Sequence, residues 1–120
     1  MSVKRILIVD DEEEIRSFLK EYGEGQGFVC TEASNGREAL DIFRAQSNIP
    51  VIVSDIRMPE MDGMTLLEEL QKFSNPPKVI LMSAYTTFSL DDARDKGAFA
   101  LISKPFPMSV MMESVLNAFK

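Results

Sequence analysis

Acidic, hydroxyl and amino side chains closely follow several short apolar runs in this sequence of 120 residues. They are Asp10 and Asp11 after residues 6–9, Asp55 after 51–53, Ser83 after 79–82 and Lys104 after 99–102. Short apolar runs rich in Val and Ile predict buried strands. Parallel strands end at a common edge of a sheet, and ligands of open α/β sheets bind at that edge. We therefore expect these five side chains to share one site.

The chemistry that suits this set is the handling of a phosphoryl group. Three neighbouring carboxylates repel one another and need a cation, and oxygen ligands without nitrogen or sulfur select Mg²⁺, or else Mn²⁺. A carboxylate can attack phosphorus to form an acyl phosphate. The metal ion, the Lys104 ammonium and the Ser83 hydroxyl would then meet the phosphoryl oxygens. Asp55, at the end of the central apolar strand, is the candidate nucleophile.

Strand and helix patterns alternate five times along the chain. Apolar runs predict strands over 3–9, 28–33, 51–53, 79–82 and 99–102. Helical spacing of apolar residues predicts helices over 12–22, 36–43, 66–73, 90–96 and 108–119. This alternation predicts a single α/β domain, with a parallel sheet covered by helices on both faces.

Two helices have apolar patterns that lead to specific expectations. In the first helix, we expect four residues to face the core: Ile15, Phe18, Leu19 and Tyr22. The helix over 90–96 has Leu90 and Ala93 as its clear apolar positions, so we expect it to pack loosely and to be the least stable helix.

Composition excludes several classes of protein. The chain has no histidine, which rules out Ser–His and Cys–His catalysis and a His-ligated metal. The single cysteine, Cys30, lies among apolar residues and is expected to be a buried thiol. A formal net charge of -6 argues against nucleic-acid binding. No apolar run approaches the length that spans a bilayer. We infer a reducing, cytoplasmic location.

Each candidate residue has a simpler interpretation when it is taken alone. An Asp after a strand is most often a turn or helix cap, and a Lys is most often a solvated surface charge. Residues 12–14 are all Glu, and we assign them to the favourable interaction of acids with a helix N-terminus. The shared site is favoured because all five candidates follow strand ends of one predicted sheet.

Four stretches together resemble the receiver domain of two-component response regulators. They are Ile8-Val9-Asp10-Asp11-Glu12, Ser54-Asp55-Ile56-Arg57-Met58-Pro59-Glu60-Met61-Asp62-Gly63, Leu81-Met82-Ser83-Ala84 and Ser103-Lys104-Pro105-Phe106. They extend over almost the whole chain, and their joint pattern is highly specific.

The resemblance implies one receiver domain over residues 1–120, with a doubly wound, flavodoxin-like, five-stranded parallel sheet in the order 2-1-3-4-5 and five helices. It implies that Asp55 accepts phosphate from the phosphohistidine of a histidine kinase or phosphotransfer protein. It also implies that Mg²⁺ is bound by Asp10, Asp11, Asp55 and the backbone carbonyl of Arg57. Lys104 would pair with the phosphoryl group, Ser83 would move towards it, and the Lys104–Pro105 peptide bond would be cis.

The sequence differs from the family pattern at Leu101, where the family usually has an aromatic or His residue three positions before the lysine. We therefore expect no aromatic switch there, and we expect the signal to pass through the loop after Ser83 and the helix over 90–96. In the family, the positions of Arg57 and Tyr85 border the path of the hydrolytic water. Tyr85 can shield the acyl phosphate and Arg57 can contact it; alternatively, both lie on the surface.

These expectations describe a signalling switch with modest self-catalysis rather than an enzyme. Its output surface would be the face of the helix over 90–96, the strand over 99–102 and the helix over 108–119, available to an effector domain or protein. Homodimer formation on phosphorylation is left open.

The alternatives are a phosphate-independent binding module, a metal-dependent phosphohydrolase and a flavin- or nucleotide-binding protein. The last would need a loop of backbone amides for phosphate where this sequence has five successive acids, residues 10–14.

Overall fold

The computed structural model describes residues 3–84 and 90–120, in which five strands alternate with five helices. The strands are β1 (Arg5–Val9), β2 (Val29–Ala33), β3 (Val51–Asp55), β4 (Lys78–Ser83) and β5 (Ala100–Ser103). The helices are α1 (Glu13–Gly25), α2 (Gly36–Ala45), α3 (Gly63–Leu70), α4 (Leu90–Asp95) and α5 (Met108–Ala118). Tyr85, for which the sequence suggested a shielding role, lies outside the described residues.

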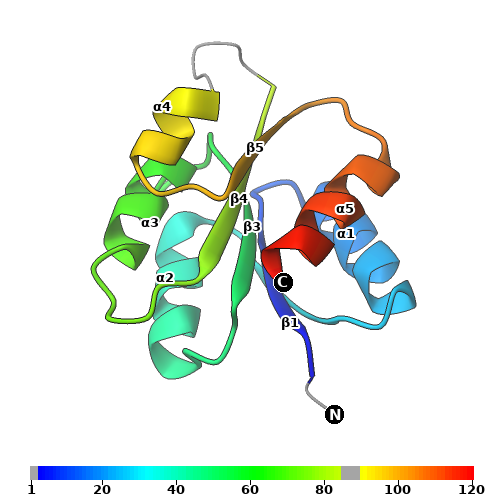
Figure 1. The fold of residues 1–120 in the computed structure, drawn as a ribbon, viewed down its shortest axis with the longest axis horizontal. Coiled ribbons are helices and arrows are strands. Elements are labelled where there is room, and N and C mark those ends of the chain that lie inside the picture. The colour runs from blue at the N-terminus through cyan, green and yellow to red at the C-terminus, as the bar shows by residue number, and fades with distance from the viewer. Residues whose placement is uncertain (1–2, 85–89) are drawn as a thin grey trace.

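The five strands form one sheet in the order β2-β1-β3-β4-β5, and every neighbouring pair is parallel. Helices α1 and α5 cover one face of this sheet, and α2, α3 and α4 cover the other (Figure 1). The predicted doubly wound sheet and its strand order are therefore confirmed.

The sheet is buried on both faces because each inner strand is apolar at consecutive positions. In β1, Ile6 and Ile8 pack in the cluster beneath α1 and α5, whereas Leu7 and Val9 pack in the cluster beneath α2, α3 and α4. The same alternation continues through β3 and β4. All five residues of β3 are buried, so this central strand is a rigid support for the residue at its end.

One predicted core position is wrong. Phe18 on α1 is 58% exposed, although Leu19 is buried and Ile15 and Tyr22 pack against the core. With 3.6 residues per turn, Phe18 lies about 100° around the helix axis from Leu19, which places it at the margin of the buried stripe. Helical spacing alone did not show how narrow this stripe is.

The element ends also differ from the predicted ones. β1 begins at Arg5 rather than at residue 3, and Val3 is 57% exposed. α3 begins three residues earlier than its apolar pattern suggested, because the carboxylate of Asp62 accepts a hydrogen bond from the Thr65 N–H at 2.8 Å and caps the helix.

One further helix cap is observed, and the predicted burial of the Cys30 thiol is confirmed. The Asn35 side chain caps α2 by accepting a hydrogen bond from the Glu38 N–H at 2.8 Å. Cys30 is a buried thiol, and its burial raises its pKa to about 11, so the unreactive protonated form prevails at neutral pH. Within residues 3–84 and 90–120, none of the helices has the length and apolar character required to cross a membrane.

Phe43 and Phe18 offer a matched test of this core. Phe43 is 1% exposed and packs edge-to-face against Phe73, so Phe43→Ala is expected to lower the free energy of unfolding by about 3–5 kcal/mol. Phe18→Ala removes the same ring from an exposed position and is expected to change it by about 0.5 kcal/mol or less. Urea unfolding of both variants measures the difference, and equal losses would contradict the placement of Phe18.

Candidate functional site

The five predicted site residues all lie at the carboxyl edge of the sheet. Asp10 and Asp11 directly follow β1, Asp55 is the last residue of β3, Ser83 is the last residue of β4, and Lys104 directly follows β5. Residues up to 94 positions apart in the chain are thus neighbours in space. The parallel topology brings them together because every strand runs towards the same edge.

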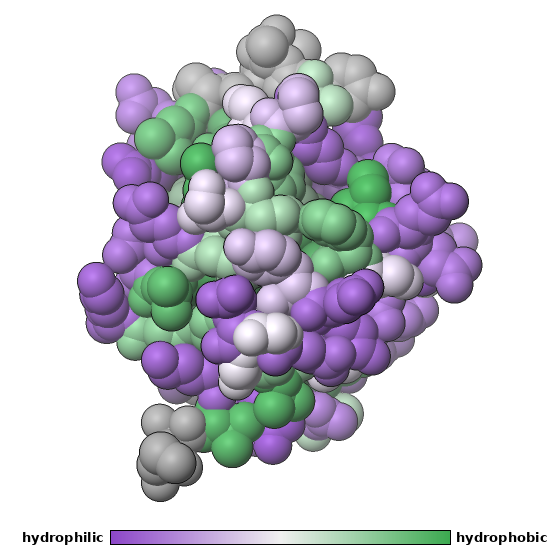
Figure 2. All heavy atoms as spheres, turned by 90° about the vertical axis from the view of Figure 1, so that its right-hand side faces the viewer, coloured by the Kyte–Doolittle hydropathy of each residue, from purple (hydrophilic) through white to green (hydrophobic). Residues whose placement is uncertain are grey.

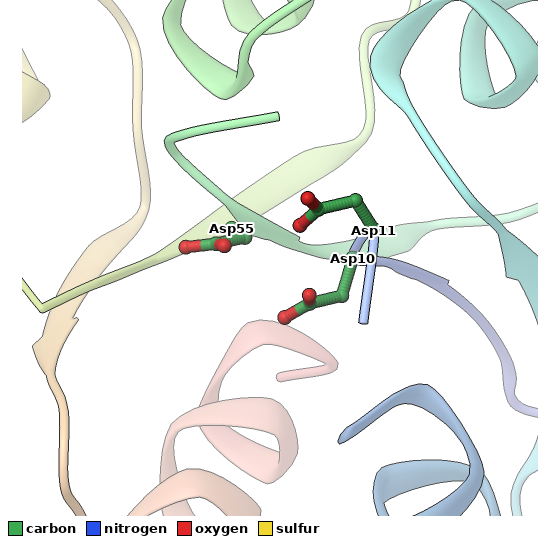
Figure 3. Close-up of side chains that lie close together, drawn as sticks. All are labelled: Asp10, Asp11 and Asp55. Carbon is green, nitrogen blue, oxygen red and sulfur yellow. The ribbon is translucent and has the colours of Figure 1, made fainter. Parts of the chain in front are cut away.

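Three carboxylates form the centre of the site. Oxygen atoms of Asp10, Asp11 and Asp55 lie within 4.8 Å of one another (Figure 3). Asp10 is completely buried and Asp55 is 8% exposed, whereas Asp11 faces solvent. The cluster therefore has a buried floor and an open side.

Lys104 contacts two of these carboxylates. Its Nζ lies 3.4 Å from Oδ1 of Asp55 and 3.5 Å from Oδ2 of Asp10. The Lys104 N–H donates a hydrogen bond of 2.8 Å to the carbonyl of Ser83, and the following peptide bond to Pro105 is cis, as the family resemblance implied. The end of β5 is therefore held against β4, with the ammonium directed at the acids.

The backbone around Asp55 is also held closely. Oδ1 of Asp55 accepts a hydrogen bond from the Ile56 N–H at 3.0 Å, and the Asp55 carbonyl accepts one from the Ser54 hydroxyl at 2.9 Å. A Cβ atom at Gly63 would lie 2.3 Å from that carbonyl, so a glycine is required where α3 starts beneath the strand end. Sequence analysis missed the roles of Gly63 and Ser54, although the Asp62-Gly63 turn signal was visible.

The remaining candidates differ in their surroundings. Ser83 is 3% exposed at the end of β4. Arg57 is exposed and lines a pocket of about 400 Å³ together with Asp62 and Lys96. Leu101 is partly buried and packs against the cluster beneath α2, α3 and α4.

The three carboxylates repel one another, and this repulsion is unfavourable unless a divalent cation is bound. Burial raises the pKa of the Asp55 carboxyl above its usual value; the Lys104 ammonium opposes this shift, and the neighbouring Asp10 carboxylate adds to it. When all three acids are ionised, the Lys104 ammonium offsets only one of their three negative charges. Hard oxygen ligands with this excess charge fit a divalent cation such as Mg²⁺. The open side at Asp11 leaves room for the water ligands that Mg²⁺ usually retains.

Residues 6–116 match the sequence model of the response regulator receiver domain, and the chain therefore belongs to that family. It is the receiver domain of a two-component response regulator. Proteins of this kind are signalling switches rather than conventional enzymes.

Two curated relatives illustrate the match. The regulatory protein AtoC of Escherichia coli is 43% identical over 120 residues, which cover 99% of this chain and 26% of AtoC. The transcriptional regulatory protein SrrA of Staphylococcus aureus is 37% identical over 108 residues, which cover 89% of this chain and 44% of SrrA. The chain thus spans less than half the length of these relatives.

Solved structures agree in fold. A response regulator receiver domain protein from Clostridium thermocellum superposes with a TM-score of 0.88 at 32% identity, over 97% of this chain and 94% of that one. The response regulator TrrA from Thermotoga maritima, solved in complex with Mg²⁺ and BeF, superposes with a TM-score of 0.87 at 34% identity, over 97% of this chain and 99% of that one.

The raised pKa of Asp55 leads to a prediction about stability in the absence of divalent cations. The folded state binds a proton at Asp55 more tightly than the unfolded state does. Ionisation of Asp55 therefore lowers the stability of the folded state as pH rises above 3.8, the pKa of this carboxyl in the unfolded state. Asp55→Asn is therefore expected to be more stable than wild type at neutral pH, and this gain should disappear in acid. Urea unfolding across a pH series measures it.

Asp41→Asn provides the control, because the Asp41 side chain is 65% exposed in a weak surface ion pair with Arg44. It should follow the wild-type pH profile. A neutral-pH loss of stability in Asp55→Asn would contradict the electrostatic description of the site.

Proposed function

We propose that Asp55 accepts a phosphoryl group from the phosphohistidine of a histidine kinase or of a phosphotransfer protein, and that the modified domain then signals to an effector. One observation carries this proposal. Lys104 Nζ lies within 3.5 Å of both Asp55 and Asp10, at a cluster of three carboxylates on the carboxyl edge of the sheet. A nucleophile, a counter-charge and a hard-cation site thus coincide.

In the proposed step, a carboxylate oxygen of Asp55 forms a bond to phosphorus while the N–P bond of the phosphohistidine breaks and its electron pair stays on the imidazole nitrogen. Lys104 pairs with a phosphoryl oxygen, so its positive charge offsets the negative charge that the phosphoryl group brings to the site. Ser83, at the adjacent strand end, donates its hydroxyl to another oxygen. Hydrolysis of the acyl phosphate later restores the Asp55 carboxylate.

The residues that would hold Mg²⁺ are Asp10, Asp11, Asp55 and the backbone carbonyl of Arg57. When bound, the ion supplies charge neutralisation for the phosphoryl oxygens. Asp10 and Asp11 are held directly after β1, so their position does not depend on the donor protein. The TrrA complex with Mg²⁺ and BeF supports this assignment by analogy.

A groove beside the site suits a phosphodonor. It has a volume of about 570 Å³, lies between α1 and the segment after β5, and is lined by Ile15, Phe18, Pro105 and Phe106 with Lys104 at its edge. Figure 2 shows hydrophobic residues among hydrophilic ones on the face that carries α1 and α5. We assign this groove to the helix that presents the phosphohistidine, because Lys104, which contacts Asp55, also lines the groove.

The output surface in this proposal comprises α4, β5 and α5. α4 buries Ala93 and leaves Leu90 39% exposed, so it has few apolar anchors that would resist displacement. Leu101 packs on the same side of the sheet as α4 and provides no aromatic ring that could change position. We therefore propose that the signal passes from Ser83 to α4 through the intervening residues, of which 85–89 lie outside the described part of the chain.

Phosphate uptake is testable with acetyl phosphate and Mg²⁺. Wild-type protein is expected to gain one phosphoryl group, and Asp55→Asn is expected to gain none because an amide is not a nucleophile for this step. Intact-mass spectrometry measures the adduct, with the exposed Asp41→Asn as the control that should label normally. Labelling of Asp55→Asn would assign the nucleophile elsewhere, and an unlabelled wild type would favour the phosphate-independent binding module.

The proposed signal route predicts changes in amide exchange. Addition of beryllofluoride and Mg²⁺ is expected to alter hydrogen exchange in residues 84–103, while exchange in the central strand β3 stays protected. Exchange mass spectrometry with and without the phosphate mimic measures this. Unchanged exchange across 84–103 would argue against a route through α4.

A further inference from the structure

Arg16 connects the acidic site to two other elements. From the first turns of α1, its Nη1 donates a hydrogen bond of 2.7 Å to the backbone carbonyl of Asp10. Its Nε lies 3.4 Å from Oε1 of Glu32 on β2. Lys20, one turn further along α1, lies 3.6 Å from the other carboxylate oxygen of Glu32. The guanidinium is therefore fixed from two sides, and its side chain is only 16% exposed.

The carbonyl that Arg16 holds belongs to the peptide unit between Asp10 and Asp11. Because a peptide unit is planar, fixing its carbonyl also fixes the position of the Asp11 nitrogen and Cα. Asp10 has further restraints, since its N–H bonds to the Ala33 carbonyl at 3.1 Å and its Oδ1 accepts from the Glu12 N–H at 2.9 Å. Asp11, in contrast, is exposed and lies beyond the end of β1.

We propose that Arg16, oriented by Glu32, is a positioning residue that holds Asp11 in register with Asp10 and Asp55 for divalent-cation binding. This inference rests on the proposed function, because it assumes that the three carboxylates bind the cation. Lys cannot replace Arg16 fully, since a single ammonium is a point charge and cannot reproduce the two separate arms of the guanidinium.

The charge of Arg16 and its geometry predict opposite effects on cation binding. A positive charge beside the acids repels a cation, so its removal should strengthen Mg²⁺ binding if charge alone matters. Loss of the hydrogen bond to the Asp10 carbonyl should weaken binding, because Asp11 loses its fixed position. Outer-shell partners of metal ligands typically contribute about 10–100-fold to metal affinity.

The test compares Arg16→Met with Lys20→Met. Both remove one positive charge from α1 near Glu32, and Met has a helix propensity close to those of Arg and Lys, so the helix itself is little affected. Mg²⁺ affinity of the unphosphorylated protein is measured by titration calorimetry. Arg16→Met is expected to bind about tenfold more weakly, whereas Lys20→Met binds as wild type does or slightly more tightly. Asp11→Ala gives the reference for a lost ligand.

A second readout separates positioning from general damage. With acetyl phosphate as donor, Arg16→Met is expected to need about tenfold more Mg²⁺ for half-maximal labelling and to retain the wild-type rate at saturation. Thermal unfolding without Mg²⁺ shows whether the variant is folded. If it is not, Arg16→Lys and Glu32→Gln replace it, and both should show a smaller loss of affinity than Asp11→Ala.

The outcomes are distinguishable. Wild-type protein that does not bind Mg²⁺ would overturn the proposed metal site and this inference with it. If wild-type protein binds Mg²⁺ and Arg16→Met binds it equally well or more tightly, this inference is overturned but the proposed metal site is not. Equal weakening in Arg16→Met and Lys20→Met would also overturn the inference, because the effect would then not depend on the contact with Asp10.

Discussion

The burial of two carboxylates at the edge of an apolar sheet is the constraint on which the site depends. At an effective dielectric constant near 20, unit charges about 4 Å apart interact by about 4 kcal/mol. The repulsion between Asp10 and Asp55 is therefore comparable with the attraction of either to Lys104, which lies 3.4–3.5 Å from both. When the acids are ionised, the Lys104 ammonium leaves one net negative charge on the Asp10 and Asp55 pair and two on the cluster that includes Asp11. This residual charge makes the pocket receptive to a cation.

Carboxylates that repel one another stay close together only when the backbone that carries them is rigid. β3 provides such a backbone, because it is buried along its whole length and is paired on both sides by parallel neighbours. The turn beneath it adds a second restraint, since Gly63 approaches the Asp55 carbonyl more closely than any side chain would allow. The Asp55 carboxylate thus projects from rigid backbone, while Asp11 lies at the open side.

The parallel sheet and the gathering of site residues at one edge could be predicted directly from residue patterns, whereas the strand order came only from the family resemblance. Continuous apolar runs indicate strands buried on both faces, and alternation with helices indicates a parallel sheet. The exposure of Phe18 could not be predicted, because helical spacing does not give the width of the buried stripe. The contact of Arg16 with the Asp10 carbonyl was also missed, since a backbone acceptor leaves no signature in side-chain types. Gly63 ends a stretch that resembles the family, and its packing role became visible only in the close approach of α3 to the Asp55 carbonyl.

The 94 positions that separate Asp10 from Lys104 have a consequence for how the pocket assembles. β5 is at the margin of the sheet, where it pairs with β4. A fragment that ends before β5 would still contain all the acids but no ammonium beside them, and its nascent pocket would be unbalanced in charge. Lys104 can reach the acids only when the last strand is paired with the sheet. A probe of the environment of Lys104 would therefore detect association between separate halves of the domain.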